Sequence, residues 1–286
     1  MRVLIAGASG ALGIQLVKQL AKLKIDFKAT TGSREGRKKL APYANEIVVV
    51  NSQESPEDFT NVTRDIDIVI SAIGKSISLF NPSSRSFHES DFVANKLLIK
   101  DALKNKVSRF IYVSMEGAME ANSFEIPGSH KETEDLLVNS GLNYSIIRPV
   151  GFFSGLNDLL IMAKRKVIPV IGSGDARTNS IYQGDLAKII IDMLETGPRV
   201  QSVGGPEIHT RKEMAKMIQK KIGGKLLFIP STLAGAGADM IKLLTSGTGN
   251  KLKYFNYIMD HDMIGERLGS MKFEEYLNTI DLKDLP

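Results

Sequence analysis

Residues 2–13 read Arg-Val-Leu-Ile-Ala-Gly-Ala-Ser-Gly-Ala-Leu-Gly, and this stretch decides the fold. Its apolar run, residues 3–6, contains β-branched side chains and predicts a fully buried strand. Three glycines follow the run at once, and leucines then recur with helical spacing as far as Lys24. The stretch therefore predicts a strand, a tight glycine turn and a helix.

The glycine turn has the features of a phosphate-binding site. A helix N-terminus carries free N–H groups and the positive end of the helix dipole, so a diphosphate fits there. Gly7 permits the sharp turn, Gly10 leaves no Cβ to block the phosphates, and Gly13 lets the helix lie close to the strand. The spacing is Gly-x-x-Gly-x-x-Gly and not the usual Gly-x-Gly-x-x-Gly, but its place between a strand and a helix supports nucleotide binding. The alternative is a glycine-rich turn without a ligand.

Composition narrows the class of protein. With 286 residues, 43% of them hydrophobic and 24% charged, the chain suits one large α/β domain or a domain with an appended lobe. The net charge of +5 comes without a long basic block, so nucleic-acid binding has little support. The chain has no cysteine, which excludes a disulfide framework and a thiol nucleophile. No histidine spacing suits a metal, and we predict no metal site.

The start of the chain and its hydropathy bear on location. The first strand begins at residue 2, which leaves no room for a signal peptide. No apolar run approaches the ~20 residues of a membrane span. We therefore predict a cytoplasmic protein, monomeric or homodimeric, that acts on a small molecule and has no membrane partner.

Strands and helices alternate over the first 150 residues, which predicts an α/β fold of the Rossmann type: a doubly wound parallel sheet with right-handed crossovers. We expect residues 1–150 to form the nucleotide-binding domain. Residues 151–286 would form a smaller α/β substrate and lid portion, from which roughly 175–203 returns to the first domain. The predicted strands are 27–31, 46–50, 66–71, 110–114 and 144–147, the predicted helices are 88–104 and 129–140, and 75–85 is a predicted loop.

The second half is less regular. It contains predicted strands at 166–171, 200–203 and 226–229. Asp185 is the predicted N-cap of one helix, and Thr210 with Glu213 forms a predicted capping box on another. From Pro230 the tail is predicted to be mostly helical. Its glycine-containing stretch 231–249 suits either a mobile lid or a packing helix.

The end of the second strand bears on the choice between NAD and NADP. NAD binders commonly place an acidic residue there, whereas an arginine accommodates a 2′-phosphate. Here Ser33 and Arg34 follow the strand, and Glu35, the first acidic residue, lies beyond the turn. The sequence predicts NADP in preference to NAD, with Ser33 and Arg34 as phosphate donors. A solvated basic helix start is the alternative.

Further motifs lie at regular places along the predicted sheet. They are the segments 7–13, 67–74, 109–114, 181–187 and 203–206, Asn95, and Lys131 with Glu134 ahead of Arg148-Pro149. With these motifs the chain, from residue 1 to about 223, resembles the short-chain dehydrogenase/reductase superfamily in its extended and atypical branches. The likeness is greatest to NmrA-like NAD(P)-binding proteins of the NAD-dependent epimerase/dehydratase type. The resemblance implies NAD(P) binding and does not specify a reaction.

The family's catalytic set is only partly present. The resemblance implies a Ser that orients the substrate carbonyl, a Tyr that transfers the proton, and a Lys four residues after the Tyr that holds the nicotinamide ribose. Ser114 matches the Ser and Lys131 matches the Lys. Pro127 stands where the Tyr is expected, and none of the seven tyrosines has a lysine four residues later. The resemblance therefore supports cofactor binding and leaves the proton donor unassigned.

Three side chains are candidates to replace the missing acid. His130 has a suitable unperturbed pKa, but neighbours on a helix face different ways, so we expect His130 at the surface or rim if Lys131 faces the cofactor. Tyr182 is expected to be a packed residue. Glu116 is expected either to relay a proton or to be solvated.

Two residues also have structural interpretations. The alternative for Lys131 is a surface ion pair with Glu134 or Asp135. Asn95 is expected to have a structural role.

Two functions follow from these residues. The first is an NAD(P)H-dependent oxidoreductase, an NADPH-dependent reductase of a small unidentified substrate, with Ser114 and Lys131 as its catalytic residues. The alternative is a non-catalytic NADP(H)-binding regulator or assembly factor, which Pro127 favours. The retained Ser and Lys incline the interpretation slightly toward the enzyme. The predicted cofactor contacts are Gly7, Ser9, Gly10, Ala11, Leu12, Gly13, Ser33, Arg34, Ser71, Ala72, Ile73, Gly74, Ser114, Lys131 and Pro149.

Overall fold

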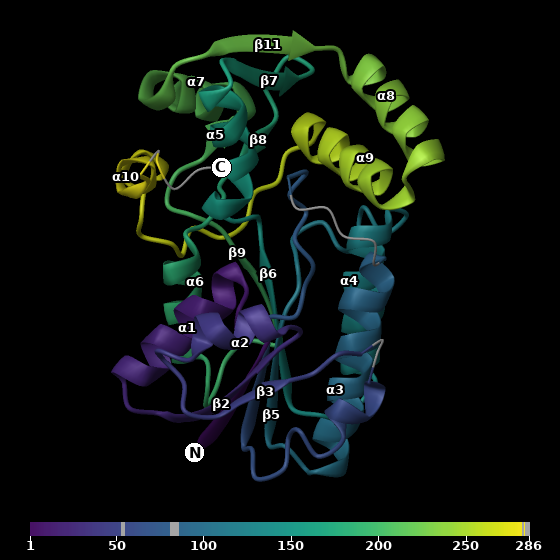
Figure 1. The fold of residues 1–286 in the computed structure, drawn as a ribbon, viewed down its shortest axis with the longest axis vertical. Coiled ribbons are helices and arrows are strands. Elements are labelled where there is room, and N and C mark those ends of the chain that lie inside the picture. The colour runs from purple at the N-terminus through teal and green to yellow at the C-terminus, as the bar shows by residue number, and fades with distance from the viewer. Residues whose placement is uncertain (53–54, 81–85, 282, 284–286) are drawn as a thin grey trace.

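Seven parallel strands form the central sheet of the computed structural model, which describes residues 1–286 except 53–54, 81–85, 282 and 284–286 (Figure 1). The strand order is β3-β2-β1-β4-β5-β6-β9. This order confirms the predicted doubly wound sheet, because the chain starts in the middle and winds outward in both directions. The strands are β1 Arg2–Ala6, β2 Asp26–Thr31, β3 Ile47–Val49, β4 Ile68–Ser71, β5 Arg109–Val113, β6 Tyr144–Pro149 and β9 Val200–Val203.

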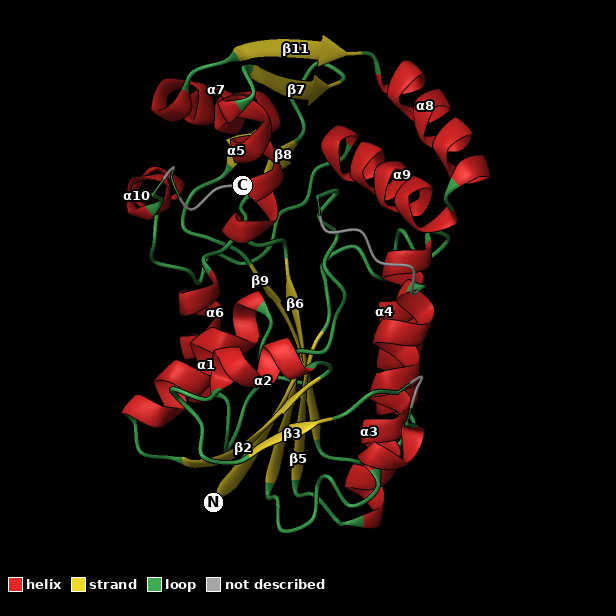
Figure 2. Cartoon of the chain, viewed as in Figure 1, coloured by secondary structure: helices red, strands yellow, loops and turns green. Residues whose placement is uncertain are grey.

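Helices cover both faces of the sheet (Figures 1 and 2). One face carries α1 Ala11–Lys22, α2 Arg34–Leu40 and α6 Gln183–Asp192. The other carries a 3-10 helix Pro56–Phe59, a π-helix His88–Val93, α3 Ala94–Lys104 and α4 Glu125–Val138. In β1, Val3 and Ile5 enter the first core while Leu4 enters the second. A strand buried on both faces needs such a continuous apolar run.

A second lobe stands on the carboxyl edge of the sheet (Figure 2). A parallel pair, β7 with β11, and an antiparallel pair, β8 with β10, form its strands. Its core contains Phe153, Leu160, Ile218 and Phe273. The lobe comprises a 3-10 helix Phe153–Leu156, α5 Asn157–Lys164, β7 Val167–Ile171, β8 Arg177–Thr178, β10 His209–Thr210, α7 Arg211–Ile222, β11 Lys225–Ile229 and α10 Phe273–Thr279.

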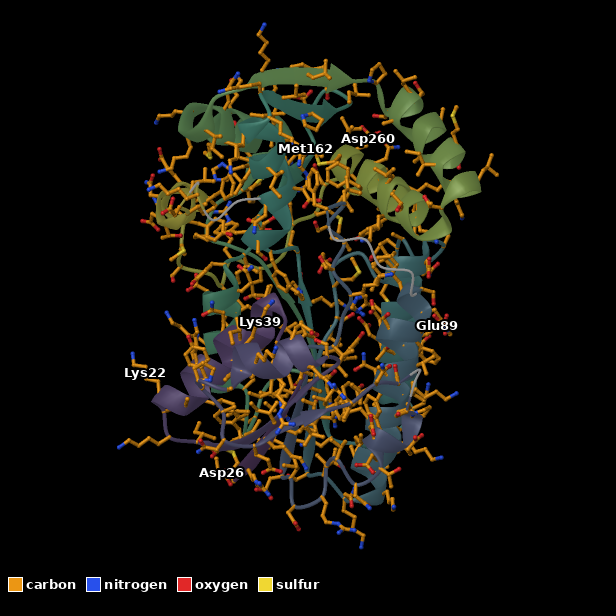
Figure 3. The ribbon with its side chains drawn as sticks, viewed as in Figure 1. Lys22, Asp26, Lys39, Glu89, Met162 and Asp260 are labelled. Atoms are coloured by element: carbon orange, nitrogen blue, oxygen red, sulfur yellow. The ribbon has the colours of Figure 1, made fainter. Side chains whose placement is uncertain are left out.

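The tail forms two further helices, α8 Ser231–Leu244 and α9 Ser246–Asp260, which pack side by side. Helix α9 rests on the start of α4 through Phe124, Tyr254 and Tyr257, whose rings lie 5.1–6.4 Å apart. Figure 3 shows Met162 of α5 and Asp260 of α9 in the upper half of the molecule, and Lys22 and Asp26 in its lower half. Within the described ranges, every helix is too short or too polar to cross a bilayer.

Several predicted boundaries hold and two do not. The capping box forms, because Thr210 Oγ1 accepts from the Glu213 N–H and Glu213 Oε2 accepts from the Thr210 N–H. Helix α4 begins at Glu125, four residues before the predicted Ser129, because Pro127 falls in its first turn, where no intrahelical N–H bond is needed. Residues 75–80 of the predicted loop contain no helix or strand, and 81–85 lie outside the described residues.

The prediction for Asp185 is wrong. Tyr182 occupies the N-cap position of α6, and Asp185 lies one turn further on. Its carboxylate accepts from the N–H and hydroxyl of Ser270 and from the N–H of Met271, all within 2.7–2.9 Å. Asp185 therefore holds the segment before α10 against the sheet domain.

Candidate functional site

The glycine turn packs backbone against backbone. Gly7 has φ of +76°, in the left-handed region that favours glycine. A Cβ on Gly7 would lie 2.5 Å from the carbonyl oxygen of Ala72, and one on Gly13 would lie 2.3 Å from the carbonyl oxygen of Gly7. These contacts bring together the turn, the start of α1 and the loop after β4, which are three of the predicted cofactor-binding segments.

Gly10 differs from Gly7 and Gly13 because it is exposed to solvent. A Cβ on Gly10 would have one neighbour within 4 Å, the Gly7 carbonyl oxygen at 3.3 Å. Gly10 is the N-cap of α1, yet among the described residues no side chain caps this helix and no acidic residue lies in its first turn. The first N–H groups of α1, from Ala11 to Gly13, therefore lack intrahelical acceptors. These donors and the open space above Gly10 fit a diphosphate.

The end of β2 lies beside this turn. Ser9 Oγ and Thr31 Oγ1 are 2.7 Å apart, and a Cβ on Gly36 would lie 2.0 Å from Thr31 Oγ1. Ser33 caps α2 by accepting from the Gly36 N–H at 3.0 Å, which leaves its O–H able to donate. Arg34, the first residue of α2, is exposed. Ser33 and Arg34 are therefore both exposed at the carboxyl end of β2.

The loop after β4 is fixed by a chain of buried hydrogen bonds. Ser71 Oγ donates to Asn95 Oδ1 at 2.5 Å, and Asn95 Nδ2 donates to the Asp91 carbonyl oxygen at 2.6 Å. The Asp91 carboxylate accepts from the Lys75 N–H at 2.8 Å. Burial raises the pKa of Asp91 to about 7. Asn95 thus has a structural role: it joins Ser71 to the π-helix His88–Val93, a rare type of helix turn that carries Asp91.

At the end of β5, Ser114 is already hydrogen-bonded to another side chain. Its hydroxyl donates to Glu134 Oε1 at 2.5 Å. Arg148 donates to both oxygens of the same carboxylate, from Nε at 3.0 Å and from Nη2 at 2.5 Å. The side chain of Glu134 is 4% exposed, and Glu134 raises the pKa of Arg148 through their hydrogen bond. Ser114, Glu134 and Arg148 form one closed polar cluster, which we call the Glu134 cluster.

Lys131 lies on another side of α4. It forms an ion pair with Asp135, one turn along the helix. Its side chain is 26% exposed. Pro127, at the position of the expected Tyr, is buried.

The expectation of a surface His130 is wrong. His130 is 9% exposed and faces β5, where its Nδ1 lies 2.8 Å from the hydroxyl of Tyr112. Burial lowers the pKa of His130 to about 4 and raises the pKa of Tyr112. A neutral, enclosed imidazole is a poor proton donor near pH 7, and this pair supports the sheet.

The other two candidate acids also have partners. The ring of Tyr182 packs in the second lobe, 6.1 Å from the ring of Tyr276, as expected for a packed tyrosine. Glu116 accepts from the Ser202 hydroxyl at 2.6 Å, and its N–H donates to the Pro149 carbonyl oxygen at 3.0 Å. Glu116 therefore connects the ends of β5, β6 and β9.

Sequence reasoning missed two acidic residues in this region. The sequence predicts Glu134 as part of a family motif and as an alternative surface partner of Lys131, and it assigns no role to Asp91. Glu134 lies four residues after His130 and seven after Pro127, so the three share one face of α4. A charged residue on the sheet-facing side of a helix indicates a buried partner, and Arg148 at the end of the next strand was the available cation.

Comparison with known proteins agrees with this site. A family model described as NAD(P)H-binding matches residues 7–197. The Arabidopsis thaliana mitochondrial protein "NADH dehydrogenase [ubiquinone] 1 alpha subcomplex subunit 9" is 23% identical over 231 residues, which cover 76% of this chain and 56% of that protein. Photosystem II assembly factor Ycf39 of Cyanophora paradoxa is 28% identical over 160 residues, which cover 54% of this chain and 47% of that protein. The chain thus spans about half the length of these curated relatives.

Solved structures share the fold over nearly the whole chain. A nucleoside-diphosphate-sugar epimerase from Staphylococcus aureus has a TM-score of 0.77 at 18% identity and covers 97% of this chain and 99% of its own. A Citrobacter sp. triphenylmethane reductase in complex with NADP(H) has a TM-score of 0.74 at 15% identity, with coverage of 98% and 99%. An Escherichia coli NADPH-dependent quinone oxidoreductase in complex with NADPH has a TM-score of 0.67 at 16% identity, with coverage of 97% and 99%.

The family match covers about two thirds of the chain and includes the glycine turn, the loop after β4 and the Glu134 cluster. The geometry of the turn and the strand order of the sheet agree with that match. This chain belongs to the NAD(P)H-binding family.

Proposed function

We propose that this protein is an NADPH-dependent reductase whose substrates accept hydride without a proton from a protein side chain. One observation carries the proposal: the glycine turn has open donors for a dinucleotide, whereas the side chains that would deliver a proton are absent or bound to each other. Pro127 stands where the tyrosine is expected, and the Ser114 hydroxyl donates a hydrogen bond to Glu134. The bound cofactor would supply a hydride, which carries two electrons.

This arrangement selects the chemistry of the acceptor. Hydride addition to a simple ketone creates a strongly basic alkoxide, which needs a general acid within hydrogen-bond reach. Hydride addition to a quinone gives a much less basic hydroquinone anion, which takes its proton from water. Hydride addition to a conjugated carbocation gives a neutral product and needs no proton. The quinone oxidoreductase and the triphenylmethane reductase that share this fold are named for such acceptors.

The chain's own residues would position these reactants. The N–H groups of the first turn of α1 would bind the diphosphate, and the loop from Ser71 to Gly74 would line the nicotinamide half. Lys131 would exchange Asp135 for the nicotinamide ribose, which is a change of partner for an exposed ion pair and costs little. The Glu134 cluster would hold the ends of β5 and β6 and helix α4 in fixed positions beside the site.

The test of the reaction compares acceptors. Purified protein with NADPH is expected to reduce a quinone and a cationic triphenylmethane dye and to leave a simple ketone unreacted, followed by the loss of NADPH absorbance. Turnover of the ketone at a comparable rate would contradict the proposal. NADPH binding without turnover of any acceptor would also contradict it.

The choice of NADPH has its own test. Replacing Arg34 by Ala is expected to weaken NADPH binding by roughly tenfold, or about 1.4 kcal/mol, because one charged donor to the 2′-phosphate is lost. NADH binding should stay unchanged. The matched control is Arg37→Ala, in the last turn of the same short helix and also exposed. Both affinities are measured by fluorescence titration. If Arg34→Ala changes NADPH and NADH affinity equally, Arg34 is a solvated residue at the helix start and does not bind the 2′-phosphate.

A second candidate function rests on the closed Glu134 cluster. If Ser114 never releases Glu134, the protein binds NADP(H) as a ligand and acts as a regulator or assembly factor, a role that the name of the relative Ycf39 also states for that protein. This candidate predicts tight NADPH binding, no turnover and a Ser114→Ala variant with unchanged nucleotide affinity. Calorimetry with NADPH and NADP then tests redox sensing, which requires unequal affinities.

A further inference from the structure

Several large apolar side chains of helix α8 are exposed to solvent. Leu233, Met240 and Leu243 are 64%, 68% and 88% exposed, and Ala236 is also exposed. In a helix that is stabilised by packing within its own chain, the large apolar residues face inward. Contiguous apolar surface of this kind marks an interaction site.

The inner side of α8 is built from small residues. Ala238 is 2% exposed, and a Cβ on Gly249 of α9 would lie 2.3 Å from Lys242 Cα. The backbones of the two helices therefore come almost into contact at this point. Figure 1 shows α8 on the outer side of this pair, with α9 nearer to α4. The outward face of α8 is left for another partner.

The spacing of the exposed residues is that of a helix–helix seam. Leu233, Ala236, Met240 and Leu243 lie at i, i+3, i+7 and i+10, which is the narrow stripe of a coiled coil. We call these four residues the α8 stripe. We propose that the α8 stripe binds the α8 stripe of a second copy of this chain, with the two helices antiparallel across a twofold axis.

The stripe is complementary to itself in this orientation. Its intervals of three, four and three residues read the same in both directions, so a twofold axis near Ala238 sets Leu233 opposite the partner's Leu243. The same axis sets the small Ala236 opposite the partner's long Met240. A twofold interface requires such a surface, in which residue i meets j and j meets i. The two α8–α9 pairs together would form a four-helix assembly.

Charge favours a second copy over a lipid surface. The stripe itself is uncharged, and α8 carries one acidic and one basic residue, Asp239 and Lys242. A helix that binds anionic lipid has a basic polar face, which α8 lacks. Asp239 flanks the stripe and already forms an ion pair with Lys253. Each copy therefore brings a neutral Asp–Lys pair to the axis and no unpaired carboxylate.

The size of the interface predicts a weak dimer. A single pair of short helices buries less than the ~800 Å² per partner of a standard interface. We expect sedimentation velocity to show a dimer at high protein concentration that dissociates on dilution. Replacing Met240 by Glu should raise the dissociation constant roughly tenfold or more, because a charge would be buried at the axis. Thermal unfolding and NADPH binding should stay unchanged, since this side chain is mainly exposed.

Val138→Glu is the matched control. Val138 is 48% exposed at the end of α4, on a different surface of the protein, and its replacement should leave the dimer intact. A protein that is monomeric at every concentration would overturn the proposal. A dimer that survives Met240→Glu or is lost in Val138→Glu would overturn it too, because the interface would then lie elsewhere.

Cross-linking tests the orientation. The chain has no cysteine, so introduced thiols report only the designed contact. A mixture of the Ala236→Cys and Met240→Cys proteins should form a disulfide-linked dimer on mild oxidation, and Ala236→Cys alone should form little. Efficient cross-linking of Ala236→Cys alone would show a parallel pair, and no cross-linking in either sample would show that the stripes do not meet. Either result would overturn the antiparallel arrangement.

Discussion

Two polar regions lie along the carboxyl edge of the same sheet, and they differ in whether their hydrogen-bonding groups are already used. At the end of β1, the first N–H groups of α1 lack both intrahelical acceptors and a capping side chain among the described residues. At the end of β5, Ser114, Glu134 and Arg148 bind one another in a closed cluster. The first region therefore has backbone donors available for a ligand, whereas the donors of the second already bind a carboxylate.

This contrast separates two requirements, nucleotide binding and proton transfer, which depend on different parts of the chain. Backbone N–H groups bind a diphosphate through geometry that three glycines preserve, whatever happens to the side chains nearby. Proton transfer depends on one side chain with the right pKa and position. In this chain Pro127 stands at the position of the expected tyrosine, Ser114 donates to Glu134, and Lys131 forms an ion pair with Asp135.

Removing Glu134 should have the largest effect, on stability. Glu134→Ala leaves Arg148 partly buried without an anion and Ser114 without an acceptor. We expect the free energy of unfolding to fall by about 3 kcal/mol, at the lower end for a broken buried ion pair because the Arg148 side chain stays 22% exposed. Urea denaturation at neutral pH measures the loss.

The matched control is Asp135→Ala, which removes the partner of Lys131 from the exposed side of the same helix. The side chain of Asp135 is 56% exposed, and its loss should cost less than about 1 kcal/mol. Similar losses in the two variants would mean that the Glu134 cluster is no more than a surface ion pair. NADPH affinity that falls as steeply as stability in Glu134→Ala would remove the distinction between the two regions.

Filling the space above Gly10 should have the next largest effect, on binding. A valine there would keep the backbone but place its side chain where the diphosphate should lie. We expect NADPH affinity to fall about 100-fold, or about 2.7 kcal/mol. The fold should persist, because the new Cβ meets one protein atom at 3.3 Å.

The control for this variant is Gly155→Val, at a position where a Cβ would meet no atom within 4 Å. Its NADPH affinity should equal that of the unchanged protein in the same fluorescence titration. A Gly10→Val protein that is folded by circular dichroism and binds NADPH normally would show that the open turn is not the nucleotide site.

The sequence predicted the first region well because its signals are local. The apolar run 3–6, the glycine spacing and the leucine period all lie within one short segment, and each constrains the backbone directly. The strand order followed from the alternation of strands and helices, since parallel strands need crossovers of one hand. The antiparallel pair β8 with β10 and the closeness of α8 to α9 have no comparable local signal.

The second region was harder to predict because its side chains are partnered across long separations. Asp185 has the residue type of an N-cap, but its partners lie 85 and 86 residues further along the chain. His130 and Lys131 do face different ways on α4, as predicted. The prediction nevertheless placed Lys131 toward the cofactor and His130 at the surface, whereas His130 is the buried one. His130 has a buried hydrogen-bond partner, the hydroxyl of Tyr112 on β5. Lys131 has an ion-pair partner on the helix surface, the exposed Asp135.

The last and smallest expected effect concerns Asp91, whose carboxylate accepts from the N–H of Lys75 in the loop after β4. The folded-state pKa of about 7 lies above the ordinary value of 3.8, so the folded protein holds this proton more tightly than the unfolded chain. Its contribution to stability is therefore complete below about pH 4 and is lost as the pH rises toward 7. The free energy of unfolding that Asp91 contributes falls by at most about 1.4 kcal/mol per pH unit. His130, with its pKa lowered to about 4, has the opposite slope between pH 4 and 6.5, so the total curve conceals both.

Comparison with Asp91→Asn isolates the effect of Asp91. The amide oxygen can still accept from the Lys75 N–H, as the protonated carboxyl does, but it does not titrate. The unchanged protein should therefore lose stability relative to the variant as the pH rises from 5 to 7, and the difference should become constant above pH 8. Urea denaturation of both proteins at each pH gives this difference with the His130 contribution cancelled. A difference that stays constant from pH 5 to 8 would mean that Asp91 is ionised throughout, and that the charge of Lys75 and the N–H bond outweigh burial.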